Sequence, residues 1–174
     1  MESERLVLEP MNLANVQDPQ YMYWLLDPAV TQYLEVGICP VHIGDLYSYL
    51  ERAREAGDLF LRITVKTGMK WIGTIHLGPI SWVHRRAELG IMIGETSEWG
   101  QGYGTEAIEA VCRHAHYRMG LEKITAGVIN LNTGAQRAFA KAGFTKEATL
   151  PHHRWCRGLW CDEYRYGRIM PPCI

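Results

Sequence analysis

The chain has 174 residues, enough for one domain with a hydrophobic core but few for two independent folding units. Hydrophobic residues make up 47% of it and charged residues 21%, and the formal net charge is -1. This composition excludes a disordered chain, a collagen-like fibre and a strongly basic nucleic-acid-binding protein. We therefore expect a single globular domain over residues 1–174 that acts as an enzyme or a binding module, with no nucleic-acid partner.

The N-terminal residues Met1 to Arg5 are too polar for the apolar part of a signal peptide, and no apolar run approaches the ~18 residues that span a bilayer. We expect a cytoplasmic protein without a membrane partner. The cysteines are odd in number and irregularly spaced, in a chain long enough to fold without disulfides. We predict five free thiols, at Cys39, Cys112, Cys156, Cys161 and Cys173.

Charge is unevenly divided along the chain. Residues 1–58 contain ten acidic and three basic residues, a net charge of -7, whereas the remainder contains fifteen basic and nine acidic residues, a net charge of +6. The C-terminal two thirds are therefore better suited to hold an anionic ligand, although chance segregation of surface charge explains the same count.

Hydrophobic periodicity predicts the elements of the first half of the chain. A short strand at Leu6 to Leu8 stops at Pro10, and apolar residues then recur at helical spacing. Alternating patterns indicate three consecutive antiparallel strands after the helices. The predicted elements are a helix within 13–25, a helix within 46–53 ending near Gly57, and strands at 60–65, 71–77 and 87–93.

The second half alternates helices and strands. Apolar residues at helical spacing predict a core-facing helix after a glycine-rich turn at residues 100–104, with Gly120 as its C-cap. A strand at 123–129, a short helix at 133–142 and a final hairpin at 144–150 and 159–169 follow. This order predicts an α/β (α+β) fold in which helices pack on a mixed sheet.

A glycine-rich segment lies between the strand that ends at Ile93 and the next helix. It reads Trp99-Gly100-Gln101-Gly102-Tyr103-Gly104-Thr105. Glycines let a backbone approach a ligand closely, and the unpaired amides of a first helical turn attract phosphate groups. We expect a phosphate or pyrophosphate to bind here.

This segment has several possible interpretations as a glycine loop. It lacks the Gly-Lys-Ser/Thr of a P-loop. Gly102, Gly104 and Ala107 fit a relaxed dinucleotide fingerprint, but they follow antiparallel strands and no acidic residue closes a second parallel strand. A simple tight turn explains one or two glycines, but not three alternating glycines at a helix start.

The ordered set of motifs resembles the GNAT superfamily of acetyl-CoA-dependent N-acetyltransferases over nearly the whole chain. More narrowly, it resembles the branch of ribosomal-protein N-terminal, spermidine and amino-sugar acetyltransferases. The motifs that carry the resemblance are Arg5 to Pro10, Asp27-Pro28, Glu88 to Ile93, Trp99 to Gly104, Asn132 to Phe144 and the closing hairpin with Asp162.

The resemblance implies a mostly antiparallel sheet of six to seven strands, flanked by about four helices, with a splay between the two central strands. It also implies that acetyl-CoA binds as cosubstrate, with its pyrophosphate on the loop amides and its pantetheine arm against the backbone of the first splayed strand. A homodimer is a family-level expectation. The expected cofactor-binding residues are Ile91, Met92, Ile93, Trp99, Gly100, Gln101, Gly102, Tyr103, Gly104, Thr105, Asn132 and Phe139.

Two residues depart from the family pattern. Trp99 stands where Gln or Arg usually opens the loop, so a side-chain contact to phosphate is lost. Phe139 stands where many relatives carry a tyrosine that protonates the leaving thiolate, and phenylalanine cannot donate a proton. Water, the ammonium product, or a nearby cysteine or tyrosine must supply that proton.

Acetyl transfer also needs a group that deprotonates the acceptor ammonium, whose pKa is near ~10. Glu88 is the first candidate because it begins the strand that leads to the cofactor, on the face of Gly90 and Met92, and His84 is the second. An ion pair of Glu88 with Arg85 or Arg86 is the structural alternative.

The group His152, His153, Cys156 and Cys161 contains metal-ligand residue types, but its spacing does not fit a zinc finger. Neighbouring histidines on a strand point to opposite faces, so we expect no metal site. One of the two histidines could line the acceptor pocket instead.

The sequence therefore predicts an N-acetyltransferase that moves acetyl from acetyl-CoA to a primary amine by direct attack. We favour a small acceptor such as an amino sugar or its nucleotide. The alternatives are a polyamine, the N-terminus of a ribosomal protein, and, in another class, a non-catalytic acyl-CoA-binding module.

Overall fold

The computed structural model of the chain describes residues 1–38 and 42–171. Within them Cys112, Cys156 and Cys161 are free, whereas Cys39 and Cys173 lie outside the described residues. No helix in the described part of the chain is both long and apolar enough to cross a membrane.

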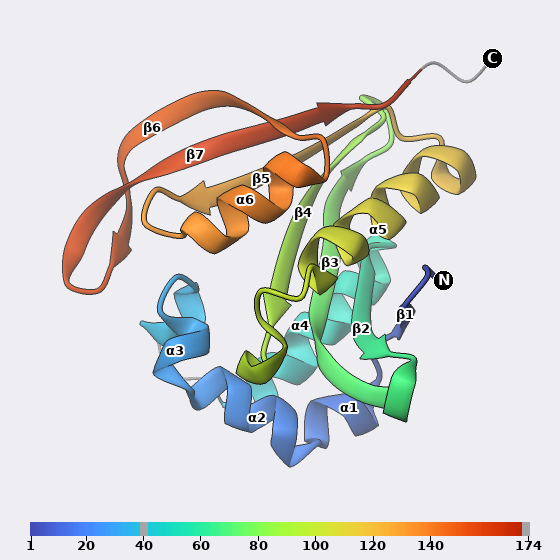
Figure 1. The fold of residues 1–174 in the computed structure, drawn as a ribbon, viewed down its shortest axis with the longest axis vertical. Helices are drawn as coiled ribbons and strands as arrows, with labels where there is room; N and C mark the ends of the chain where they lie inside the picture. Colours follow the sequence, from blue (N-terminus) through green and yellow to red (C-terminus); the bar gives the residue numbers. More distant parts are fainter. Residues whose placement is uncertain (39–41, 172–174) are drawn as a thin grey trace.

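Seven strands form one mixed sheet in the order β1-β2-β3-β4-β5-β7-β6 (Figure 1). Every neighbouring pair is antiparallel except β4 and β5, which are parallel. This arrangement confirms the predicted mixed, mostly antiparallel sheet. The strands are β1 (Leu6–Pro10), β2 (Leu59–Val65), β3 (Lys70–Ser81), β4 (Arg86–Ile93), β5 (Lys123–Ile129), β6 (Thr145–Cys156) and β7 (Leu159–Ile169).

The helices match the prediction in the second half of the chain and differ from it in the first. The segment predicted as one helix within 13–25 is two, because Asp18 and Pro19 end the first and start the second. Asp18 accepts a hydrogen bond from the Gln20 amide, and Pro19 has no amide to lose at the first helical position. The α-helices are α1 (Leu13–Gln17), α2 (Pro19–Leu26), α3 (Pro28–Thr31), α4 (Ile43–Ala56), α5 (Tyr103–Met119) and α6 (Thr133–Lys141), and the 3₁₀ helices are η1 (Glu35–Gly37), η2 (Thr67–Met69) and η3 (Thr96–Glu98).

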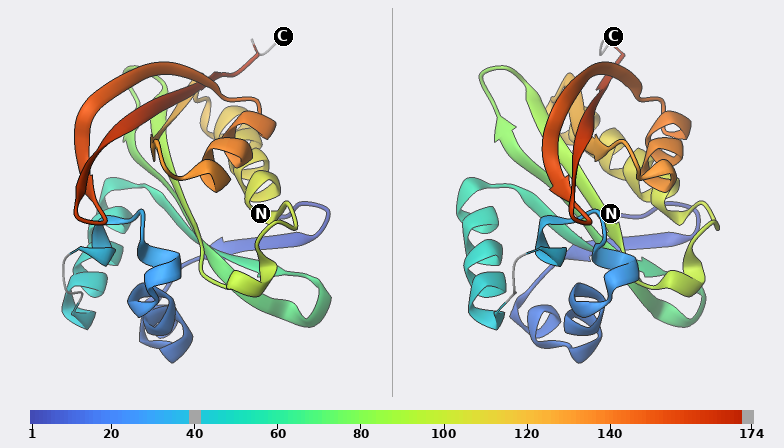
Figure 2. Two further views of the ribbon diagram at one scale, coloured as in Figure 1. Left: turned by 60° about the vertical axis from the view of Figure 1, so that its left-hand side comes forward. Right: turned by 90° about the vertical axis from the view of Figure 1, so that its left-hand side faces the viewer.

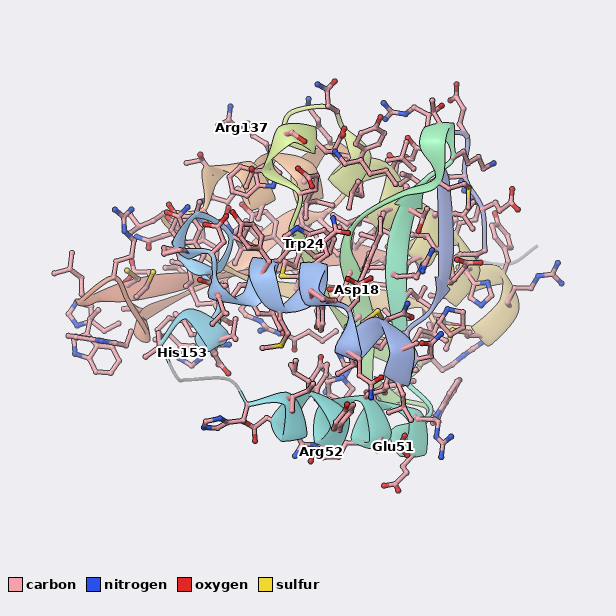
Figure 3. The ribbon with its side chains drawn as sticks, turned by 90° about the horizontal axis from the view of Figure 1, so that it is seen from below. Asp18, Trp24, Glu51, Arg52, Arg137 and His153 are labelled. Atoms are coloured by element: carbon pink, nitrogen blue, oxygen red, sulfur yellow. The ribbon has the colours of Figure 1, made fainter. Side chains whose placement is uncertain are left out.

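Two hydrophobic clusters lie on opposite faces of the sheet. The larger joins the sheet to α5 and α6, and includes Leu89 and Ile108. The smaller joins the sheet to α1, α2 and α4, and is centred on Trp24, which packs edge-on against Trp71 with ring centroids 5.0 Å apart. In Figure 3, Trp24 lies between α2 and the sheet, while Arg52 and Glu51 lie on the outer side of α4.

Strand alternation assigns the side chains of β4 to these two faces. Ala87 and Leu89 are buried in the larger cluster, whereas Met92 packs against the smaller one. Glu88 and Gly90 therefore point to the face that carries α1–α4, as the alternation predicts. The early helices cover only part of this face.

A polar contact joins β1 to the start of α5. The Glu106 carboxylate accepts hydrogen bonds from the Ser3 hydroxyl and from the backbone amide and Nε of Arg5, each at 2.7 Å. Arg5 Nη1 also donates to the Gln101 carbonyl, at 3.0 Å. The N-terminal strand therefore fixes the junction between the glycine loop and the helix.

This junction predicts a pH-dependent stability. Partial burial raises the pKa of Glu106, but the hydrogen bonds from Arg5 and Ser3 outweigh it, so the pKa lies below 4.5. The carboxylate therefore contributes stability that is present above about pH 4.5 and is lost as the pH falls through the folded-state pKa. Glu106→Gln should cost about 1 kcal/mol at neutral pH and lower Tm by roughly 2–4 °C. Thermal melts across pH should show the gap to the wild type closing in acid, and a gap independent of pH would contradict this account.

Candidate functional site

The central strands β4 and β5 separate soon after they meet. Their parallel pairing runs from Arg86 opposite Lys123 to Glu88 opposite Thr125, and the strands diverge beyond it (Figure 1). Ile91, Met92 and Ile93 continue to pair with β3 on their other side. The edge of β4 that faces β5 is therefore open, and the predicted splay is confirmed.

The glycine loop follows directly from the open part of β4. Gly100 and Gly102 adopt φ angles of +79° and +84°, which favour glycine, and Gly102 is the N-cap of α5. The amides of the first turn of α5, at Tyr103, Gly104 and Thr105, have no partner within the helix. They form a site for an anion at the positive end of the helix dipole.

Trp99, which departs from the family pattern, connects this loop to the strand. Its indole Nε1 donates to the Ile93 carbonyl at 2.8 Å, while 45% of the residue stays exposed. The side chain thus holds the loop against the end of β4.

A cavity of about 250 Å³ extends from the strand separation toward α3 and the β6–β7 hairpin. Among the predicted cofactor residues it is lined by Ile91, Asn132 and Phe139. Asn132 caps α6, with Oδ1 accepting from the Ala135 amide at 3.0 Å, which leaves its side-chain NH₂ to donate. The residues that line the wall farther from the loop are Gln32, Tyr33, Leu34, Glu35, Ile38, Arg154, Trp155, Cys156 and Glu163.

Phe139 is buried, with 3% of its surface exposed. Its ring packs edge-on against Phe144 and stacks on Tyr166. It therefore offers the cavity an apolar surface without a proton. The cavity-lining side chains that do carry such a proton include Tyr33 and Cys156, and burial raises the pKa of the Cys156 thiol.

Glu88 forms an ion pair with Arg165 of β7, rather than with either neighbour that the sequence suggested. Arg165 Nη1 and Nη2 lie 3.0 Å from the two carboxylate oxygens of Glu88. Arg165 also donates to Glu163 at 2.9 Å. The two carboxylates raise the pKa of the guanidinium further, so Arg165 is a permanent cation in this site.

Glu163 is a buried carboxylate, with 2% of its surface exposed. Burial raises its pKa, but hydrogen bonds from Arg154 and Arg165 lower it below the usual value. It fits against the sheet because Gly127 has no side chain, since a Cβ there would lie 2.7 Å from Glu163 Oε1. Glu88, Glu163, Arg154 and Arg165 thus form a charged wall beside the separated strands.

The end of the β6–β7 hairpin meets the segment around α3 (Figure 2). Arg154, which contacts Glu163 at 2.5 Å through Nε, also pairs with Glu35 through Nη1. Cys156 Sγ donates to the Gln32 carbonyl at 3.0 Å. These contacts between residues more than a hundred positions apart close one side of the cavity.

Gly90 forms an exposed floor beside this charged wall. It lies in the interior of a central strand and lines the cavity, and a Cβ built on it would meet no atom within 4 Å. Open space above a central strand, beside charged side chains and within a cavity, can admit a ligand.

Other residues singled out in the sequence lie apart from this site. His84 is exposed in the turn between β3 and β4, at the end of β4 farther from the glycine loop, and does not line the cavity. His152 and His153 are exposed on β6. Among the residues that the structure describes, no three His, Cys, Asp or Glu side chains gather as a metal site would require.

Sequence reasoning missed the arginines and carboxylates of the hairpin. Alternation along β7 places Glu163 and Arg165 on one face and Tyr166 in the core, a signal that was available in the sequence. The contact of Arg165 with Glu88 could not be predicted from the sequence, because it depends on β7 lying beside β5 in the sheet.

Comparisons with known proteins agree with this architecture. Residues 5–145 match the family model described as an acetyltransferase (GNAT) domain. An uncharacterized N-acetyltransferase, p20 of Bacillus licheniformis, is 28% identical over 174 residues, covering 96% of this chain and 94% of the relative.

Solved structures extend the likeness in fold. Spermidine N-acetyltransferase from Vibrio cholerae, in complex with CoA and spermine, superposes with a TM-score of 0.84 at 18% identity, covering 96% of each chain. RimL, a ribosomal L7/L12 alpha-N-protein acetyltransferase in complex with coenzyme A, gives 0.84 at 17% identity, covering 97% of this chain and 96% of that one. The family match confirms the resemblance expected from the motifs: this chain belongs to the GNAT family of acetyltransferases.

Proposed function

We propose that the protein transfers acetyl from acetyl-CoA to the primary amine of a small molecule, such as an amino sugar or a sugar nucleotide. The observation that carries this proposal is the cavity that begins where β4 leaves β5 and ends at a wall of carboxylates. The end of the cavity at the strand separation suits an extended amide chain, and the end at the carboxylates suits an ammonium group.

The cosubstrate fits the groups that the fold leaves unpaired. The first amides of α5 and its dipole would hold the pyrophosphate. The open edge of β4, from Ile91 to Ile93, would pair with the amides of the pantetheine arm much as an added strand does. The NH₂ group of Asn132 would donate to the same arm, and Phe139 would pack near the thioester.

The charged wall, together with Glu35, favours the ammonium group of an acceptor. Three carboxylates, Glu35, Glu88 and Glu163, stand against the two guanidiniums of Arg154 and Arg165, which leaves one negative charge in excess. We assign Glu88 to the reacting amine, because it shares its face with the open floor at Gly90. Its contacts with Arg165 would hold it in place while it attracts and orients the ammonium.

The chemistry is a direct attack. The neutral amine adds to the thioester carbonyl, the carbon–sulfur bond breaks, and the leaving thiolate takes up a proton. Since Phe139 has no proton to give, we assign that donation to Cys156 or Tyr33, which line the same cavity.

Acetyl-CoA should stabilise the protein. Ligand at about 100 times its Kd adds roughly 2.7 kcal/mol, which raises Tm by about 5–10 °C for a domain of this size. NAD and ATP serve as controls in the melts.

Mass spectrometry of amines incubated with acetyl-CoA then identifies the acceptor among glucosamine, a sugar nucleotide, spermidine and a peptide with an N-terminal alanine. Modification of the peptide alone would contradict the small acceptor, and a stabilised protein without any product would support the acyl-CoA-binding module instead.

A side chain at position 90 should block the acceptor and spare the fold. Gly90→Val places its methyl groups in open space above β4, so Tm should hold within about 2–4 °C and acetyl-CoA should still raise it. We expect kcat/KM for the acceptor to fall by about 10-fold or more. Gly44→Ala, in the first turn of α4 and also facing open space, is the matched control and should keep full activity. Full activity of the Gly90 variant would place the acceptor elsewhere.

A further inference from the structure

A chain of polar side chains lies beside the Gly90 floor, on the side opposite the charged wall. The Tyr49 hydroxyl of α4 lies 2.6 Å from Nδ1 of His76 on β3. His76 Nε2 lies 3.3 Å from Oδ2 of Asp58, which follows α4. The three residues thus form a continuous path from a partly exposed hydroxyl to a carboxylate that is 8% exposed.

The local sequence accommodates this carboxylate closely. A Cβ on Gly78 would lie 2.1 Å from Asp58 Oδ2, so only glycine admits Asp58 here. Within the described part of the chain, Asp58 Oδ1 and His76 Nε2 are buried without a hydrogen-bond partner, although Nε2 lies 3.3 Å from Asp58 Oδ2. A buried polar pair left in this state costs stability, and such sites tend to have a function.

The position of His76 brings it next to the acceptor floor. It is directly opposite Gly90 in the antiparallel β3–β4 pairing, so the two side-chain positions lie about 5 Å apart on one face. Because Gly90 has no side chain, nothing from β4 separates the imidazole from the open space. The Tyr49 ring contacts both His76 and Phe60, which orients its hydroxyl over β3.

The proposed reaction still needs a proton acceptor at this place. Both oxygens of Glu88 already accept from the Arg165 guanidinium. Burial lowers the pKa of His76, against the opposing pull of Asp58, so the imidazole is neutral near pH 7 and its ring can accept a proton.

We propose that Tyr49, His76 and Asp58 form a proton relay that deprotonates the acceptor ammonium above Gly90. An N–H bond of the ammonium breaks as an O–H bond forms on Tyr49, and the hydroxyl proton of Tyr49 passes to Nδ1 of His76. The imidazolium that results is balanced by the Asp58 carboxylate. A second proton of the amine is released after the attack and restores the donor, Cys156 or Tyr33, that has protonated the CoA thiolate. This inference rests on the proposed acetyl transfer.

The kinetic test compares Tyr49→Phe with Tyr47→Phe across about pH 6 to 10. Tyr47 lies on the same helix, but its hydroxyl accepts from Gln17 and does not contact His76. For the relay, Tyr49→Phe should lower kcat/KM for the acceptor by on the order of 10²-fold near pH 7 and leave KM for acetyl-CoA unchanged. The loss should shrink as the pH approaches the ammonium's own pKa, because the neutral amine then forms in solution. The Tyr47 variant should match the wild type.

A loss of equal size at every pH, or a change in KM for acetyl-CoA, would assign Tyr49 a structural role and overturn the relay. Unchanged kinetics would overturn it as well. The charged and titratable groups around His76 are Tyr49 of α4, Asp58, and Glu88 on the neighbouring strand, and the charge of Arg52 acts on Tyr49. A Glu88→Gln background repeats the comparison without that carboxylate.

A second measurement decides the relay without any acceptor. Nitrogen-15 NMR of the free protein, with His76 assigned by comparison with His76→Gln, reports which ring nitrogen carries the proton. The relay requires a neutral ring near pH 7 with the proton on Nε2 and with Nδ1 accepting from Tyr49. A proton on Nδ1, or an imidazolium near pH 7, would overturn it. Failure of acetyl-CoA to bind would remove the proposed function, whereas a proton on the wrong ring nitrogen would overturn the relay alone.

Discussion

The early separation of β4 from β5 is the constraint on which the rest of the site depends. A closed sheet pairs the backbone amides and carbonyls of both neighbours, and unpaired ones at its centre are costly. Here the two strands pair over only three positions, although they lie in the middle of seven. The strands are paired at one end of the gap, and at the other end Asn132, Ala135 and Phe139 line the cavity between them. Backbone groups at the gap are thereby available to an extended ligand.

Because side chains alternate along β4, its residues contribute to both faces of the sheet. Leu89 anchors the strand in the core with α5, so the helix that begins at the glycine loop is held firmly against it. Glu88 and Gly90 point to the other face, where the helices that precede β2 leave room. A packed face and an open face thus belong to a single eight-residue strand. Precise placement of the two reactants is a large part of catalysis in such enzymes.

Most of the fold could be predicted from sequence, because alternation, helical spacing and glycine caps are local signals. The strand at Lys123–Ile129 has the predicted bounds, and Gly57 and Gly120 end their helices with positive φ angles. The break at Asp18-Pro19 and the extension of β6 to Cys156 were missed, since a short interruption and a twisted strand with shifted register blur the period. The glycine loop and the open edge of β4 could be predicted because they form one continuous stretch of sequence. The polar clusters around Gly90 could not, because their groups come from α4, β3, β4 and β7 and meet only in the folded sheet.

The carboxylate of Glu163 occupies the volume that a side chain at Gly127 would need. The two positions lie on adjacent strands, 36 residues apart in sequence, yet each limits what the other can be. Replacing Gly127 alone would bring its side chain into a steric clash with the buried Glu163 carboxylate. Shortening Glu163 alone would leave Arg154 and Arg165 facing the cavity without this partner. We therefore expect Glu163 and its neighbours Gly127, Arg154 and Arg165 to change together rather than singly.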